Sequence, residues 1–338
     1  MLDRISQGFR RIIPNAGTSV PLVSYVVIAY DMPQQAEITI RSLLPGYQRG
    51  VSASDYEILI VENASSNTLC DTFLQTLPAN VSYHLRKETR PTPIHAINYG
   101  LERARGQHIC VMIDGARLLT PGVVRNTILG HRLADNAIVT VPGYHLGKEL
   151  QQNAVSSGYD MAHERRLMQS IAWPDNGYRL FEIACFSGSC KWGFFLSQSE
   201  SNCISMSAKL WRKLGGFDAR FEARGGGLVN LDTYKRALEY PGTRHIVLPG
   251  EGSFHQFHGG ATTGGEAEKD REALIDSIKE EYFSIRGEKY KAPETDPVYL
   301  GEFPREAQKF IHFSSDKILE RVQNSAKPQD DLASIIDN

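Results

Sequence analysis

The stretch VSYVVIAY (residues 23–30) is an apolar run rich in β-branched residues, and such a run predicts a buried strand. Three more strands are predicted downstream, with helical stretches between them. They are YEILIVEN (56–63), VSYHLR (81–86) and HICVMID (108–114). Strands that alternate with helices indicate parallel pairing through crossover helices. The sequence therefore predicts an α/β fold built on an open, mostly parallel sheet with helices on its faces.

Polar residues stand at the carboxyl ends of the first, second and fourth predicted strands. They are Tyr30 and Asp31, Glu62 and Asn63, and Asp114. Ligands of open parallel sheets bind beyond the carboxyl ends of the strands, so these residues are the first candidates for a binding site. A dinucleotide-binding dehydrogenase would carry GxGxxG directly after its first strand. The chain has AYDMPQQ there, which excludes that class.

The composition describes an ordinary globular chain. Of 338 residues, 41% are hydrophobic and 22% are charged, which excludes an intrinsically disordered protein. A net charge of -2 offers no general electrostatic attraction for nucleic acid, so no nucleic-acid partner is expected. Five cysteines without a CxxC pair argue against a disulfide scaffold or a cysteine-rich zinc module. A reducing, cytoplasmic location fits best.

The N-terminal segment has a pattern of its own. Leu2, Ile5, Phe9 and Ile12 recur at a spacing of three to four residues, with arginines between them. Residues 2–13 could therefore lie on an anionic membrane surface, although so short a segment more often docks on its own domain. No apolar run approaches the length of a membrane span. Any membrane contact is expected to be peripheral, at the inner face.

Four blocks of sequence follow one another between residues 20 and 260. They are VVIAYDMPQQAEITIRSLLPGYQ, ILIVENASSN, HAINYGLERARGQHICVMIDGAR, and LWRKLGGFDARFEARGGGLVNLDTYKRAL with the later HQFHGG. In this order and spacing the chain resembles the family 2 nucleotide-sugar glycosyltransferases of GT-A fold. The resemblance implies transfer of a sugar from a nucleotide-sugar donor to a hydroxyl group of a glycan or lipid-linked acceptor. Such activity would serve the synthesis of a surface polysaccharide or another glycan.

The resemblance also suggests how the chain is divided. Residues 20–265 would form the GT-A domain, with a Rossmann-like nucleotide-binding half (20–117) and an acceptor half (118–265). Residues 1–19 would be the amphipathic N-terminal segment. Residues 266–325 would form C-terminal helices appended to the domain, and residues 326–338 a frayed tail.

Glu62 and Tyr30 are the candidates for contact with the base. A carboxylate at a strand end can accept the ring N–H of uracil or guanine, while a tyrosine can stack on the base. This favours a UDP-sugar, with a GDP-sugar as the second choice. The alternative role for Glu62 is to cap the serines that follow it.

Asp114 stands where the DxD motif of the resembled family begins, and here the sequence departs from that motif. The second acid is replaced by Ala116, so binding of a divalent cation (Mn²⁺ or Mg²⁺) should be weakened. Two compensations are open: Arg117 could neutralise phosphate directly, or Asp114 could hold a metal together with a histidine. The alternative for Arg117 is a solvated cation at a strand end.

His255 and His258 lie three residues apart in the glycine-flanked loop GEGSFHQFHGG. Related enzymes often supply a histidine to the metal or diphosphate from this region. Neutral imidazole is a metal ligand, and charged imidazole donates to phosphate. We therefore expect Asp114, His258 and His255 to be the metal ligands, with His258 the stronger histidine candidate.

The catalytic base is the least certain assignment from sequence. Aligning GGGLVNLDTYKR with the family block puts Asn230 at the position of the basic carboxylate, and an amide cannot accept a proton there. The remaining carboxylates are Asp232, Glu200 and Glu222. Asp232 has an alternative role as a first-turn helix acid. Because the DxD and Glu-Asp motifs are both altered, the alternative function is a catalytically silent relative that binds nucleotide or glycan.

Overall fold

A computed structural model describes residues 20–87, 92–196, 198–199, 201–258 and 268–324. The predicted amphipathic segment at residues 2–13, the tail at 326–338 and Glu200 lie outside these ranges.

An eight-stranded sheet forms the centre of the protein, in the order β12-β10-β6-β9-β4-β1-β2-β3. Its strands are β1 (Val23–Ala29), β2 (Tyr56–Asn63), β3 (Val81–Arg86), β4 (His108–Met112), β6 (Ala137–Thr140), β9 (Cys203–Ser207), β10 (Arg244–Val247) and β12 (Val298–Tyr299). Only β9 runs antiparallel to its neighbours, β4 and β6, and the other pairs are parallel. The predicted α/β fold with a mostly parallel sheet is confirmed.

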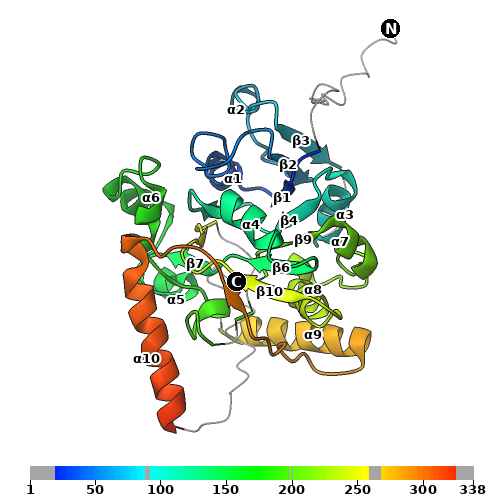
Figure 1. The fold of residues 1–338 in the computed structure, drawn as a ribbon, viewed down its shortest axis with the longest axis vertical. Coiled ribbons are helices and arrows are strands. Elements are labelled where there is room, and N and C mark those ends of the chain that lie inside the picture. The colour runs from blue at the N-terminus through cyan, green and yellow to red at the C-terminus, as the bar shows by residue number, and fades with distance from the viewer. Residues whose placement is uncertain (1–19, 88–91, 197, 200, 259–267, 325–338) are drawn as a thin grey trace.

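Helices cover both faces of this sheet (Figure 1). The α-helices in the described ranges are α1 (Pro33–Arg41), α2 (Asp71–Leu74), α3 (Ile94–Arg103), α4 (Val123–His131), α5 (Gln151–Ala154), α6 (Met161–Ser170), α7 (Ala208–Leu214), α8 (Val229–Leu238), α9 (Glu268–Arg286) and α10 (Gln308–Asn324). Successive side chains of a strand point to opposite faces. On β1, Tyr25 and Val27 therefore pack with α1 and α4, while Val26 and Ile28 pack with α3, α7 and α8.

A second, four-stranded sheet carries much of the candidate site. It consists of β5 (Arg117–Leu119), β11 (Ser253–His255), β7 (Gly143–Leu146) and β8 (Ala184–Phe186). Its register pairs His255 with Arg117 on one side and with His145 on the other. Residues paired in this way share a face of the sheet. The sheet thus presents a polar row on one face, while Phe254 and Tyr144 belong to an aromatic core on the other.

The C-terminal part contains the two predicted helices, α9 and α10, and also a strand that was not predicted. The strand β12 pairs with β10 and so extends the main sheet. The side chains of Ile278 and Tyr282 on α9 pack into the same core cluster as α8. No helix in the described ranges combines the length and apolar composition needed to cross a bilayer.

A buried histidine on β10 gives the fold a predicted sensitivity to acid. His245 contacts the hydroxyl groups of Thr140 (2.9 Å) and Thr295 (3.0 Å), and burial lowers its pKa to about 4. The unfolded chain binds a proton near pH 6.5, so stability is full above that pH and is lost as the pH falls towards 4. Between pH 7 and pH 4.5, the free energy of unfolding should fall by about 2 to 3 kcal/mol more in the wild type than in His245→Gln. Urea unfolding of both proteins at the two pH values measures this. An equal decrease in the free energy of unfolding of the two proteins would show that His245 does not change protonation on unfolding.

Candidate active site

Asp114 lies just beyond the carboxyl end of β4, in a turn that packs against the end of β1. A Cβ atom on Gly115 would come within 2.6 Å of the Ile28 carbonyl oxygen, so this close approach requires glycine. The backbone N–H of Ala116 donates to Asp114 Oδ1 at 2.9 Å. This bond orients the carboxylate, and the other oxygen, Oδ2, faces the histidines of the small sheet.

Three of the predicted ligand residues come together here. Asp114 Oδ2 lies 3.1 Å from His255 Nε2 and 3.5 Å from His258 Nε2. The two imidazole nitrogens are 3.1 Å apart. All three ligand atoms lie within 4.8 Å of one another, the one such Asp/Glu/His/Cys group found among the described residues. The arrangement can hold a divalent cation.

The charges of the three residues depend on one another. Burial alone would raise the pKa of Asp114, but the contacts with His258 and His255 hold it well below its usual range. Burial lowers the pKa of His255 to about 4, and Asp114 offsets this only in part. Burial acts on His258 in the same direction, yet the attraction of Asp114 is stronger and raises the pKa of His258. The site therefore combines an anionic carboxylate with one neutral imidazole and one imidazole that protonates readily.

Arg117 is fully buried, so the interpretation of a solvated strand-end cation is wrong. Its nearest acid is Asp114, with 4.0 Å between Arg117 Nε and Asp114 Oδ2. None of its three guanidinium nitrogens has a hydrogen-bond partner among the described residues. A buried guanidinium without hydrogen bonds is costly to the fold. An anionic ligand would supply the hydrogen-bond acceptors that this guanidinium lacks among the described residues.

Sequence analysis missed two residues behind the histidines. Gln151 on α5 contacts His255, and Glu164 on α6 contacts Gln151. Burial raises the pKa of Glu164 to about 7. Both lie in the segment 143–206, whose sequence follows no clear strand or helix period. The only signal was Asp160, which accepts a hydrogen bond from the His163 N–H and caps α6.

Glu62 is buried at the end of β2, with 1% of its surface exposed. Its Oε2 atom accepts hydrogen bonds from the Tyr83 hydroxyl (2.7 Å) and the Leu69 N–H (3.2 Å). Its Oε1 atom accepts none from the described residues. The carboxylate is thus anchored by one oxygen and leaves the other for a donor. The predicted capping of the following serines by Glu62 is not found.

Asp31 caps those serines instead. Its Oδ1 atom accepts hydrogen bonds from the N–H groups of Ser66 (2.7 Å) and Asn67 (2.8 Å). The neighbouring Tyr30 is 56% exposed at the end of β1, so its ring is open to a ligand. Asn63 is buried and makes one long contact, 3.5 Å, from Nδ2 to the Thr92 carbonyl. Asp31 shapes the loop at this edge, while Tyr30 and Asn63 remain predicted nucleotide contacts.

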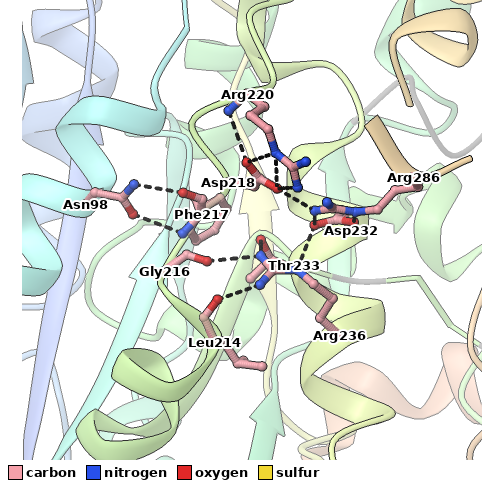
Figure 2. A network of polar contacts seen from close by, with 10 residues as sticks. All are labelled: Asn98, Leu214, Gly216, Phe217, Asp218, Arg220, Asp232, Thr233, Arg236 and Arg286. Carbon is pink, nitrogen blue, oxygen red and sulfur yellow. Dashed lines mark hydrogen bonds and ion pairs between the residues drawn. The ribbon is translucent and has the colours of Figure 1, made fainter. Parts of the chain in front are cut away.

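Asp232, the first choice for a catalytic base, lies in a buried ion-pair network (Figure 2). Arg286 donates to both of its carboxylate oxygens, at 2.6 and 2.7 Å, and Arg236 donates to Oδ2 at 2.8 Å. Arg286 also bonds Asp218 at 2.8 Å. Guanidinium groups occupy three of the roughly four lone-pair sites of this carboxylate, and the side chain is buried. We therefore correct the assignment of Asp232 from a base to a residue that ties α9 to α8.

This correction predicts a stability effect. Asp232→Asn should lower the free energy of unfolding by about 2 to 4 kcal/mol, because two arginines lose their common anion. Asp276→Asn on the exposed surface of α9 is the matched control and should change stability by less than about 0.5 kcal/mol. Urea unfolding measures both. An Asp232→Asn protein of wild-type stability whose turnover falls on the order of 100-fold would restore the base assignment.

Two base candidates remain besides Asp232. Glu222 is exposed, and its backbone N–H donates to Glu281 on α9 at 2.7 Å. Glu200 lies outside the described residues. Both residues remain predicted base candidates.

A mostly parallel sheet with a cluster of potential ligand residues beyond the carboxyl end of β4 defines an α/β protein, in a class whose ligands generally bind at that edge. Within this class, residues 24–176 match the family model described as Glycosyl transferase family 2. The predicted resemblance to family 2 glycosyltransferases is thereby confirmed over that segment. No curated protein matches the chain significantly.

Solved structures resemble the chain at low sequence identity. S. aureus TarS 1-349 has 11% identity and a TM-score of 0.47, with 91% of this chain and 75% of the TarS chain covered. The complex of TarS 1-349 with UDP-GlcNAc has 13% sequence identity and a TM-score of 0.47, with 89% of this chain and 72% of the TarS chain covered. Mannosyltransferase PcManGT from Pyrobaculum calidifontis, in complex with GDP-Man and Mn²⁺, has 15% sequence identity and a TM-score of 0.47. The match covers 92% of this chain and 78% of the PcManGT chain.

Proposed function

We propose that this protein is a nucleotide-sugar glycosyltransferase whose donor binds over the carboxyl ends of β4, β1 and β2. The observation that carries the proposal is the cluster of Asp114, His255 and His258 beside the buried guanidinium of Arg117, which has no hydrogen-bond partner among the described residues. A diphosphate is the anion that suits a site with a cation ligand set and a buried guanidinium. The family 2 match over residues 24–176 supports a sugar as the group transferred.

The residues present fit a divalent cation. One carboxylate oxygen and two imidazole nitrogens converge, a set that favours a transition-metal ion such as Mn²⁺ over Mg²⁺, which prefers oxygen ligands. A cation bound there would stabilise the charge that develops on the departing diphosphate. Asp114 and the two histidines would hold it in place of the usual two acids of a DxD motif.

Arg117 makes this cation site conditional on the nucleotide. Its positive charge opposes protonation of His255 and of His258, and it must oppose a cation at the same atoms. A diphosphate would supply the negative charge that offsets both Arg117 and the cation. Cation and nucleotide should therefore bind cooperatively, each strengthening the other.

Glu62 would select the base. Replacing it with Gln keeps an oxygen for Tyr83 and Leu69 but can turn an amide N–H₂ group toward the base. That group would then face the ring N–H of uracil, so two donors would oppose each other. UDP affinity should fall by about 1 to 3 kcal/mol, while CDP, whose base lacks that N–H, should lose less. Isothermal titration calorimetry with UDP and CDP measures both. Equal UDP affinity in the variant and the wild type would remove Glu62 from the base contact.

The acceptor and the cellular setting are further proposals. A glycan or lipid-linked hydroxyl is the acceptor that the family resemblance implies, in the synthesis of a surface polysaccharide or other glycan. Peripheral contact with the inner face of a membrane through residues 2–13 would bring the enzyme to a lipid-linked acceptor.

A catalytically silent relative is the second candidate function. Two observations favour it: Ala116 replaces the second acid of the DxD motif, and Asp232 is held by two arginines. The two functions differ in the release of free nucleotide. A transferase should slowly hydrolyse UDP-sugar or GDP-sugar without acceptor, and His258→Gln should slow this release. A wild-type protein that binds the nucleotide-sugar but releases no UDP or GDP, with and without Mn²⁺, would favour the silent relative.

A further inference from the structure

The side chain of Gln151 is fully buried behind His255, and the orientation of its amide is fixed by its contacts. Its nitrogen, Nε2, faces the His255 carbonyl oxygen (3.1 Å), which can only accept, and Glu164 Oε2 (3.3 Å), the atom that also accepts from the Phe257 N–H. The remaining atom, Oε1, lies 2.6 Å from His255 Nδ1. Because Oε1 can only accept, His255 Nδ1 must carry the proton.

This proton determines what the other ring nitrogen can do. A neutral imidazole with its proton on Nδ1 has a free lone pair on Nε2. His255 Nε2 is the atom that faces Asp114 Oδ2 at 3.1 Å and His258 Nε2 at 3.1 Å. With the opposite tautomer, an N–H group would point at the position where a cation binds. Gln151 therefore prepares His255 to act as a ligand.

Glu164 fixes Gln151 in turn. Its Oε2 atom accepts hydrogen bonds from the Phe257 N–H (2.8 Å), the Tyr159 hydroxyl (3.2 Å) and Gln151 Nε2. Phe257 immediately precedes His258, so the same carboxylate also holds the backbone that carries the second histidine. Glu164 is 8% exposed, and its bonds reach both histidine positions from outside the cluster.

We infer that Gln151 is a positioning residue that holds His255 in the Nδ1–H tautomer, with Glu164 anchoring Gln151, so that Nε2 is always presented to a cation. The inference rests on the cation site of the proposed function. Supporting groups of this kind orient ligating histidines, and their removal typically costs about 10- to 100-fold in metal affinity. Neither residue belongs to the blocks that carry the family resemblance.

The first test measures Mn²⁺ binding to the full chain in the presence of UDP. The electron paramagnetic resonance signal of free Mn²⁺ monitors the binding. Gln151→Met keeps the length and removes the acceptor, and should weaken Mn²⁺ binding by about 10- to 100-fold. Asn153→Leu, an exposed substitution on the same helix, is the control and should bind as the wild type does.

The second test reads the tautomer without metal or activity. Protein labelled with ¹⁵N-histidine, with the His255 signals identified by their absence in His255→Gln, shows which ring nitrogen carries the proton. In the wild type His255 should be protonated on Nδ1, and in Gln151→Met this preference should be lost. A merely structural role for Gln151 would leave the tautomer unchanged. The wild-type spectrum alone decides the point if Gln151→Met fails to fold.

The outcomes separate the two proposals. If the wild type binds no Mn²⁺ with UDP, GDP or neither, the cation site fails, and the tautomer measurement still decides whether Gln151 sets the protonation of His255. If the wild type binds Mn²⁺ and Gln151→Met binds it equally well, the cation site stands and the role of Gln151 is overturned. An Nε2–H tautomer in the wild type also overturns it.

Discussion

Replacing Arg117 with methionine is expected to weaken UDP binding on the order of 100-fold while leaving the ligand-free protein as stable as the wild type, or more stable. The loss follows because hydrogen bonds and ion pairs with a buried charge contribute several kcal/mol in a medium that screens poorly. The gain follows because the guanidinium has no hydrogen-bond partner among the described residues, and burying such a group destabilises the fold. Calorimetric titration with UDP and urea unfolding measure the two effects.

Arg117→Lys is the matched control for the charge. It keeps a cation but loses the planar fork, so its UDP affinity should lie between those of the wild type and Arg117→Met. The methionine variant should also bind Mn²⁺ more tightly in the absence of nucleotide, because a repulsive charge has gone. A variant that is strongly destabilised yet binds UDP normally would show that Arg117 serves the fold and not the ligand.

The second large effect is expected at Asp114. Asp114→Asn should abolish the strengthening of UDP binding by Mn²⁺ and lower any UDP release from UDP-sugar on the order of 100-fold or more, because the only carboxylate of the cluster is lost. His258→Gln removes one ligand but keeps the pairing of Asp114 with Arg117, and should produce a smaller loss of about 10- to 100-fold in Mn²⁺ affinity.

Both variants are compared by calorimetry with UDP, with and without Mn²⁺, and by assay of released UDP. Asp276→Asn, an acid on the exposed surface of α9, is the control for an unspecific effect of charge. Full UDP release by Asp114→Asn in the presence of Mn²⁺ would exclude Asp114 as a ligand. Full wild-type activity in EDTA would leave Arg117 as the sole counter-charge.

The strands and their carboxyl ends could be predicted because their signal is local. The runs at residues 23–30 and 56–63 are apolar and continuous, which is typical of strands buried on both faces. Tyr30 and Glu62 follow directly from where those runs stop, and Asp114 from the end of the run at residues 108–114. The short strand β12 was missed because its two residues, Val298 and Tyr299, are too few for a pattern.

The convergence of Asp114 with His255 and His258 was predicted from a family resemblance and not from spacing. The physical cause lies in the register of the small sheet, which sets His255 opposite Arg117. No sequence period predicts such a pairing between segments more than 130 residues apart. The same limit explains why the burial of Arg117 was not predicted, since a charged residue at a strand end is usually solvated.

Asp232 was misassigned for a related reason. Its position in the first turn of α8 was consistent with either a base or a structural acid. The partner that decides between them, Arg286, comes 54 residues later in the sequence. Gln151 and Glu164 were missed because their hydrogen bonds reach the cluster through His255 and the Phe257 backbone, from behind the ligand atoms. Residues that support the ligand residues without forming part of a sequence motif cannot be recognised in a single sequence.

We propose that cation and nucleotide share one site in which each offsets the charge that opposes binding of the other. Titrating Mn²⁺ into the wild-type protein, first alone and then with saturating UDP, tests this most directly. We predict that UDP tightens Mn²⁺ binding by about tenfold or more, and that Mn²⁺ tightens UDP binding by the same factor, as linkage requires. Equal Mn²⁺ affinity with and without UDP, or with GDP in its place, would contradict the account.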